Sequence, residues 1–115
     1  MKTLNMSNFI YALIIVLVFL CSQAFGQMKA IYFNADWNKA NHIDWFTKLN
    51  DVQKETMDVS KGDCQKQYKI AVIPTIIIMK DGEEIKRYQA DLSFKMLATR
   101  KEIQEFINEQ IMSDF

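Results

Sequence analysis

The pattern of apolar and polar residues predicts strands that alternate with helices, followed by a hairpin and a last helix. Met28 to Asn34 is short, apolar and aromatic, which is typical of a buried strand. β-Branched residues follow the chain's one proline, Pro74, and predict a second buried strand. Asp81-Gly82 comes next and favours a tight hairpin turn, because both residues tolerate positive φ.

The segment after this turn alternates between apolar and polar residues. The apolar positions are Tyr88, Ala90, Leu92, Phe94 and Met96. Strict period two predicts one long, half-buried strand. Ile85 is out of phase with the series, so a bulge is expected near Lys86-Arg87.

The helices are shorter and are predicted from spacing and caps. His42–Asn50 carries apolar residues on one face, and Asn38 before it is a candidate N-cap. A weak strand is predicted at Glu55–Val59, and a short helix at Cys64–Lys69 after Asp63. Thr99-Arg100-Lys101-Glu102 is a capping box that opens the last helix, whose apolar positions are Ile103, Phe106, Ile107 and Ile111. The order β-α-β-α-β-β-α predicts an α/β fold with a mixed sheet and helices on both faces.

The first 26 residues have the layout of a secretory signal peptide. Lys2 precedes an apolar run, Ile10 to Leu20, and Ala24-Phe25-Gly26 places small residues before Gln27. The run is shorter than the roughly 20 apolar residues of a membrane span. We expect cleavage after Gly26, a mature domain at 27–115 that is secreted to the periplasm, and no membrane contact after cleavage. An uncleaved anchor and a lipid anchor at Cys21 are the alternatives.

Charge and cysteine content exclude several classes of function. The formal net charge is zero, which does not favour nucleic acid as a partner. Cys64 is the one cysteine of the predicted domain, so it has no internal disulfide partner. His42 is the one histidine, without the clustered ligands of a metal site, so we predict no metal and no cofactor.

Several short motifs together resemble the thioredoxin family. They are Phe33-Asn34-Ala35-Asp36-Trp37, Asp58, Tyr68, Ile73-Pro74-Thr75 and Asp81-Gly82, and the resemblance covers Met28 to Ile111. It implies a minimal thioredoxin-like three-layer fold with a four-stranded mixed sheet in the order 2-1-3-4. It also implies a cis bond between Ile73 and Pro74.

The redox site of that family is missing here. Asn38 and Asn41 replace the two redox cysteines of the loop Trp37, Asn38, Lys39, Ala40, Asn41, and Tyr32 stands where the resemblance places a buried acid. A thiolate is the nucleophile of disulfide exchange, and a second thiol resolves the mixed disulfide. Asparagine does neither, so we predict a degenerate loop with no catalytic residue.

Three functions are compatible with these features. The resemblance implies a groove for extended peptide at Trp37, Asn38, Asn41, Ile73 and Pro74, hence a redox-inactive module that binds an unknown polypeptide partner. The second is a thiol–disulfide oxidoreductase that works through Cys64 alone. The third is a structural subunit that forms a homodimer through the edge strand Glu55–Val59, whose unpaired backbone groups can accept a partner strand.

Overall fold

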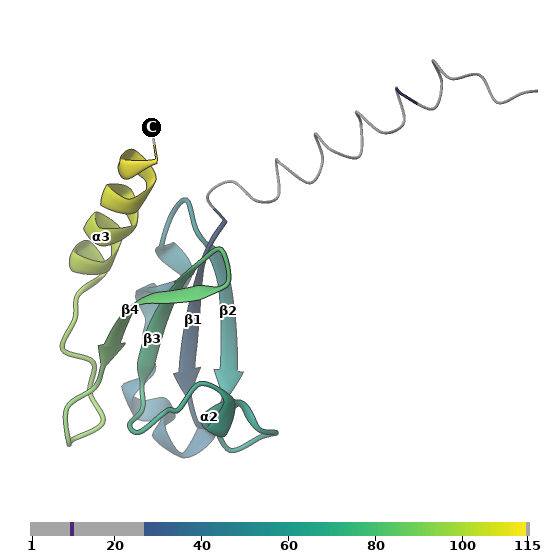
Figure 1. Cartoon of the computed structure of the whole chain (residues 1–115). Helices are drawn as coiled ribbons and strands as arrows, with labels where there is room; N and C mark the ends of the chain where they lie inside the picture. Colours follow the sequence, from purple (N-terminus) through teal and green to yellow (C-terminus); the bar gives the residue numbers. More distant parts are fainter. Residues whose placement is uncertain (1–9, 11–26, 115) are drawn as a thin grey trace, which may run out of the picture.

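The structure is a computed structural model that describes Ile10 and residues 27–114 (Figure 1). The predicted signal peptide and its cleavage site therefore lie outside the described residues, apart from Ile10. Among the described residues, no helix has the length and apolar character needed to cross a membrane.

A four-stranded mixed sheet forms the centre of the domain (Figure 1). Its strands are β1 (Met28–Asn34), β2 (Gln53–Asp58), β3 (Thr75–Lys80) and β4 (Glu83–Gln89), in the spatial order β2-β1-β3-β4. β1 pairs parallel with β2 and antiparallel with β3, and β3 pairs antiparallel with β4. This is the predicted strand order, with β2 at one edge.

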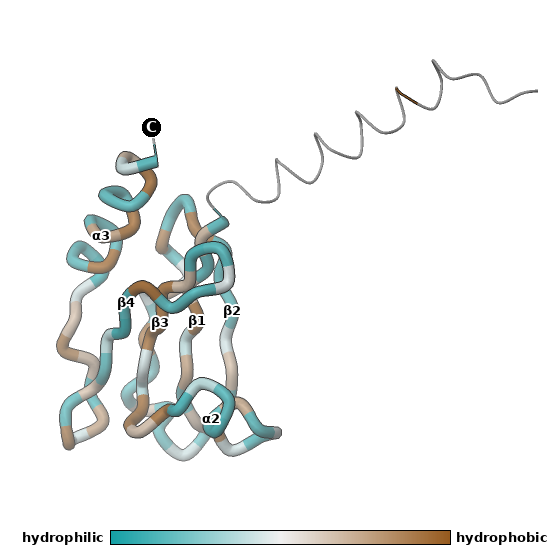
Figure 2. Tube along the Cα trace, in the orientation of Figure 1, coloured by the Kyte–Doolittle hydropathy of each residue, from teal (hydrophilic) through white to brown (hydrophobic). Residues whose placement is uncertain are grey.

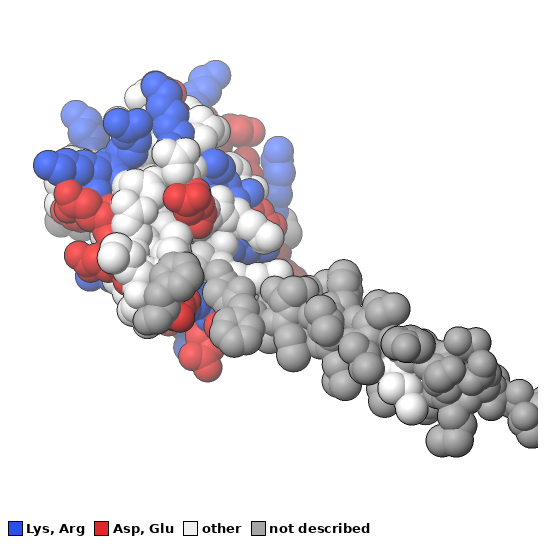
Figure 3. Space-filling view, turned by 90° about the horizontal axis from the view of Figure 1, so that it is seen from above, with Lys and Arg blue, Asp and Glu red and all other residues white. Residues whose placement is uncertain are grey.

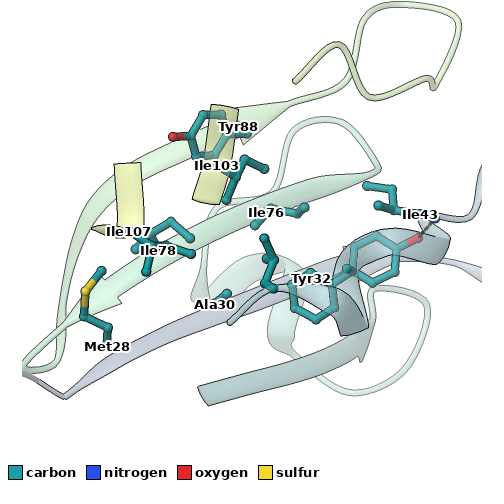
Figure 4. Close-up of a cluster of buried hydrophobic side chains, with 11 residues drawn as sticks. Met28, Ala30, Tyr32, Ile43, Ile76, Ile78, Tyr88, Ile103 and Ile107 are labelled. Carbon is teal, nitrogen blue, oxygen red and sulfur yellow. Dashed lines mark hydrogen bonds between the residues drawn. The ribbon is translucent and has the colours of Figure 1, made fainter. Parts of the chain in front are cut away.

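The two faces of the sheet carry separate apolar clusters. Successive strand residues point to opposite faces, so Ile76 and Ile78 of β3 belong to one cluster and Ile77 to the other. The first cluster packs against η2 (Asp44–Lys48) and against Ile103 and Ile107 of α3 (Arg100–Ser113) (Figure 4). The second packs against α2 (Cys64–Gln67) and the segment after it. Helices on both faces are thus confirmed.

Thr99 opens α3, and this half of the predicted capping box is confirmed. Thr99 is the N-cap, and its hydroxyl accepts a hydrogen bond from the Glu102 N–H at 3.1 Å. Apolar and hydrophilic residues alternate along the helix in Figure 2, and the apolar positions Ile103 and Ile107 are buried. On the face seen from above in Figure 3, acidic and basic side chains both occur, with uncharged residues between them.

The prediction of an α-helix at His42–Asn50 is wrong. The 3₁₀ helix η2 lies within these residues instead, and a second 3₁₀ helix, η1 (Asp36–Asn41), lies just before them. Ile43 between them is extended, because its N–H donates to the Tyr32 hydroxyl at 3.1 Å rather than to a carbonyl of the preceding turn. Asn38 is likewise no N-cap: it lies inside η1, and Ala35 takes the cap position.

The long strand predicted through Met96 is also wrong. β4 ends at Gln89, and beyond it only an isolated bridge joins Ala90 to Met96. The intervening turn is closed by the Asp91 carboxylate, which accepts hydrogen bonds from the Ser93 N–H at 2.8 Å and the Lys95 N–H at 3.2 Å. An aspartate that bonds to the backbone two residues ahead is a turn signal, and it overrides the alternating pattern.

Two smaller differences concern the start of β2 and the position of the bulge. β2 begins at Gln53, two residues before the predicted start, and Val59 follows it with its N–H bonded to the Asn34 carbonyl at 2.9 Å. The β3–β4 register shifts between Ile78 and Met79, which leaves Ile85 as the extra residue. The bulge therefore lies next to the predicted position, Lys86-Arg87.

We expect Ile78→Ala to lower the free energy of unfolding by about 2–5 kcal/mol, because it leaves a cavity in the cluster under α3. Urea unfolding measures this loss. Met112→Ala is the matched control, since Met112 is 74% exposed and its truncation should change stability by less than about 0.5 kcal/mol. A loss under about 1 kcal/mol at position 78 would contradict the assigned core.

Candidate functional site

A groove opens at the end of the sheet where β1 and β2 stop and β3 begins. Its volume is about 330 Å³, and it is lined by Trp37, Val59, Ser60, Gln65, Ile70, Ala71, Val72, Ile73 and Phe94. Trp37 is 65% exposed, and its ring meets the Phe94 ring edge-on, with 5.2 Å between centroids and 89° between planes. The groove is thus bounded on one side by two exposed aromatic rings.

Three asparagines behind Trp37 form a chain of hydrogen bonds. Asn41 Nδ2 donates to Asn38 Oδ1 at 2.9 Å, and Asn38 Nδ2 donates to Asn34 Oδ1 at 3.1 Å. Asn34 Nδ2 then donates to the Tyr32 hydroxyl at 2.9 Å. All three bonds run in one direction, so each polarises the next. The two residues that stand where the resemblance places the redox cysteines therefore hold each other in place.

Tyr32 ends this chain and joins it to His42. Its hydroxyl oxygen accepts hydrogen bonds from Asn34 Nδ2 and from the Ile43 N–H, so its own proton is directed to His42 Nδ1 at 3.1 Å. With Nδ1 as the acceptor, the hydrogen-bond directions assign the proton of a neutral imidazole to Nε2. Burial raises the pKa of the Tyr32 phenol above its usual value, which keeps it a neutral donor. A buried neutral phenol does not replace the carboxylate that the resemblance places here.

The loop Asp91–Lys95 is attached to the same chain. Besides Asn34 Oδ1, the Asn38 Nδ2 amide donates to the Phe94 carbonyl at 3.3 Å. Phe94 has a φ of 65°, an uncommon conformation for an aromatic residue. The Ser93 hydroxyl and nearby backbone N–H groups bind the Asp91 carboxylate, and they hold its pKa below the ordinary range.

The structure places the predicted groove residues in different environments. Trp37 and Ile73 line the groove. Pro74 is fully buried, and Asn38 is only 4% exposed, so neither side chain reaches the groove surface. Asn41 is partly exposed, but its amide supports Asn38. The Ile73–Pro74 bond is cis, as the resemblance implies.

The sequence reasoning missed Phe94 and six other groove residues: Val59, Ser60, Gln65, Ile70, Ala71 and Val72. The alternating pattern assigned Phe94 to the interior of a strand, whereas it is exposed in a loop and lines the groove. The spacing of Asp91 and Ser93 was the available signal, because aspartate followed by a small polar residue favours a turn.

Cys64 lies outside the groove lining. It begins α2 and is partly buried against the cluster of Ile31, Phe33 and Ile77. Its thiol faces the Asp58 carbonyl, with 3.4 Å between sulfur and oxygen. The Cys64 side chain therefore packs at the edge of the core.

Two other hollows bring polar side chains together: one of about 210 Å³ is lined by residues that include Asp36, Lys39, His42 and Asp58. A larger hollow of about 710 Å³ lies at the opposite end of the sheet, near Gln27, Gln53 and Gly82, where no nucleophile is paired with a base. Within residues 27–114, no group of three or more His, Cys, Asp or Glu side chains is placed to bind a metal ion.

Comparison with known proteins gives a match in structure alone. No protein-family model matches the chain, and no curated protein sequence does. The thioredoxin of Fasciola hepatica superposes over 82% of this chain and 90% of its own, with 23% identity and a TM-score of 0.54. Thioredoxin-2 of the malaria parasite covers 73% and 84%, with 16% identity and a TM-score of 0.57. The chain has the thioredoxin fold.

A thioredoxin mutant of Entamoeba histolytica matches similarly, with 22% identity, a TM-score of 0.56, and coverage of 75% of this chain and 84% of that one. At these identities the likeness extends to the fold, and the chemistry has to be inferred from the residues of the site. Here those residues are amides, a phenol and two exposed aromatic rings.

For Tyr32→Phe, we expect a loss of about 1–3 kcal/mol of stability, because the amide donors of Asn34 and Ile43 lose a buried acceptor. The ¹⁵N spectrum of the imidazole should show His42 protonated on Nε2 in the wild type and lose that preference in the variant. Tyr68→Phe is the control. Protonation of wild-type His42 on Nδ1 alone would contradict the assigned hydrogen-bond direction.

The order of the Asp91–Lys95 loop should depend on pH. Because the folded pKa of Asp91 is lowered, its bonds stabilise the loop fully above the unfolded value of about 3.9 and are lost as the pH falls through the lowered pKa. An NMR titration of the Ser93 and Lys95 amides measures this, and Asp91→Asn should abolish the transition. A midpoint above the usual aspartate range would show that the carboxylate does not hold the loop.

Proposed function

We propose that this protein is a redox-inactive, secreted thioredoxin-like module that binds an extended segment of a polypeptide partner. The observation that carries the proposal is the pair Asn38 and Asn41, which fills the former cysteine positions with mutually bonded amides. Neither side chain supplies a thiolate, whereas the ring of Trp37 beside them is largely exposed. On this proposal, amides stand in place of the thiols, and the exposed ring of Trp37 provides an apolar surface for binding.

The backbone at Ile73 supports a peptide as the ligand. Within the described residues, the loop and turn hydrogen bonds do not use the Ile73 N–H or C=O. An extended peptide can pair with such free backbone groups while its side chains enter neighbouring pockets. The groove between Ile73 and Trp37 lies beside these groups.

We also propose that the protein is secreted, and the support for this comes from its sequence. The signal-peptide layout of the first 26 residues supports export, and the periplasm is the compartment we propose. Intact mass of the exported protein tests it, because cleavage after Gly26 leaves Gln27 as the first residue. Retention of the full leader would instead support a membrane anchor.

We expect the wild type to bind members of an unbiased peptide-display library saturably and to show no insulin reduction. The Trp45→Phe variant leaves Trp37 as the one tryptophan, so its fluorescence reports occupation of the groove. Trp37→Ala should raise Kd about tenfold or more, as truncation of an aromatic anchor does.

Cys64→Ser separates this function from the redox alternative. It should leave peptide affinity unchanged, because Cys64 does not line the groove. Thiol labelling of the native protein is expected to be slow compared with the denatured chain. Rapid native labelling together with insulin reduction that Cys64→Ser abolishes would replace the binding module with a monothiol oxidoreductase.

The third function, a structural subunit that dimerises through β2, is tested by the mass of the protein in solution. β2 is an edge strand, and its central residues are Glu55 and Thr56. Thr56→Pro removes a backbone donor from that edge and should convert any strand-paired dimer to a monomer. A monomeric mass for the wild type at working concentration would exclude the structural-subunit function.

A further inference from the structure

The Tyr32 hydroxyl lies among three nitrogen atoms and has just enough hydrogen-bonding capacity for them. Asn34 Nδ2 is at 2.9 Å, the Ile43 nitrogen at 3.1 Å and His42 Nδ1 at 3.1 Å. Figure 4 shows the hydroxyl directed toward the backbone of Ile43. A hydroxyl donates one hydrogen bond and accepts two. The arrangement is therefore complete only while His42 Nδ1 is an unprotonated acceptor.

A second proton on His42 breaks this arrangement. An imidazolium donates from both of its ring nitrogens and accepts at neither. The Tyr32 oxygen would then face three donors with two lone pairs, and its own proton would have no acceptor. Because Tyr32 is only 1% exposed, bulk water does not supply one. A buried polar group without a partner is costly, so the groups around Tyr32 have to rearrange.

One of the three neighbours can reverse its role. The Ile43 N–H is a backbone donor, and the imidazolium has no acceptor to offer. The Asn34 side chain carries an oxygen and a nitrogen on the same planar group, so a half-turn of its amide presents Oδ1 to the Tyr32 proton. Tyr32 then accepts from Ile43 and His42, donates to Asn34, and is satisfied again.

The reversal passes along the amide chain as far as Phe94. Once Asn34 has turned, its Nδ2 group faces the Asn38 Nδ2 group that had donated to it. Asn38 turns in response, followed by Asn41, whose side chain is partly exposed. Each amide keeps a partner in the reversed order. The Phe94 carbonyl does not, because Asn38 Oδ1 now stands where the Nδ2 donor was.

The bond that is lost is the longest of the set. Asn38 Nδ2 lies 3.3 Å from the Phe94 carbonyl, whereas the bonds between the amides are 2.9 and 3.1 Å long. Phe94 has a φ of 65° and lies in an exposed loop, so release relieves local strain and lets water reach its carbonyl. The Asp91 bonds to Ser93 and Lys95 do not involve Asn38 and are kept.

We propose that Tyr32 and His42 form a pH switch, in which protonation of His42 reverses the amide chain and releases the Asp91–Lys95 loop from Asn38. The loop is held while His42 is neutral and is released as the pH falls through the range in which imidazole titrates, between about pH 5 and 8. The acid transition expected at Asp91 lies below this range. The proposal goes beyond the proposed function and requires no bound partner.

Charged side chains of η1, η2, β2 and the loop after β4 lie around His42. Those that share its two hollows are Asp36, Lys39, Asp44, Asp58 and Lys95. Three are carboxylates and two are ammonium groups, so charges of both signs act on the ring. Asp44 Oδ1 lies 3.8 Å from Nε2, and the side chain of His42 is 52% exposed. Solvent protons therefore reach the ring, and Asp44 can pair with an imidazolium at the nitrogen that Tyr32 does not contact.

An NMR pH titration of the wild-type protein tests the switch. The imidazole ¹⁵N shifts report the protonation of His42, and the ¹³C shift of the Phe94 carbonyl reports its bond from Asn38. We expect a step in the Phe94 shift with the same midpoint as the His42 titration, and a change in the side-chain amide shifts of Asn34 and Asn38 at that pH. His42→Gln should abolish the step between about pH 5 and 8, because glutamine does not titrate.

Tyr32→Phe separates the switch from a through-space effect of charge. The variant keeps the imidazole but removes the hydroxyl, so His42 should still titrate while Phe94 no longer responds. Asp44→Asn is the matched control: it removes a carboxylate beside His42 and keeps Tyr32, so the two titrations should remain coupled. His42→Gln lies at an exposed position and keeps the proposal testable if Tyr32→Phe does not fold.

Three results would overturn the switch. A constant Phe94 shift while His42 titrates would show that the amide chain does not reverse and that the imidazolium turns away from Tyr32. A step that persists in His42→Gln would belong to another titrating group. A step that persists in Tyr32→Phe would be a through-space effect. None of these results concerns peptide binding, so each would leave the proposed function standing.

Discussion

The hydrogen-bonded chain from Asn41 through Asn38 and Asn34 to Tyr32 is the interaction on which the site depends. Buried amides and hydroxyls have to be hydrogen-bonded, because an unpaired one costs about 1–3 kcal/mol. This requirement fixes η1 against β1, turns Ile43 out of the helix toward Tyr32, and attaches the Phe94 loop. A local set of neutral polar groups thereby positions three separate segments around the groove.

The same chain occupies the place at which the resemblance to the thioredoxin family puts a redox site. Disulfide exchange needs a thiol that ionises, and its surroundings have to accept that change of charge. The amides of Asn38 and Asn41 stay neutral and satisfy each other. The structural matches, at 16–23% identity, reflect the sheet and its helices. The fold alone therefore does not determine function, which depends on the side chains at the end of the sheet.

Two segments from different parts of the chain wall the groove. Ile73 before the buried Pro74 belongs to the part that resembles the thioredoxin family. The Asp91–Lys95 loop is built by this chain's own turn residues, and it holds Phe94 in a left-handed conformation that few aromatic residues adopt. Such local strain persists because the Asp91 and Asn38 bonds fix the loop from both sides.

The sequence by itself determined the two central strands, the hairpin turn and the last helix. The apolar runs of β1 and β3, the Asp81-Gly82 turn and the Thr99 cap are local signals, and each describes an element whose own residues decide its form. Tertiary structure alone decided the 3₁₀ helices and the end of β4. Ile43 bonds to Tyr32, eleven residues away, and Asn38 bonds to Phe94, fifty-six residues away. Periodicity describes which side chains are apolar, whereas hydrogen bonds between distant segments decide which of them the fold leaves exposed.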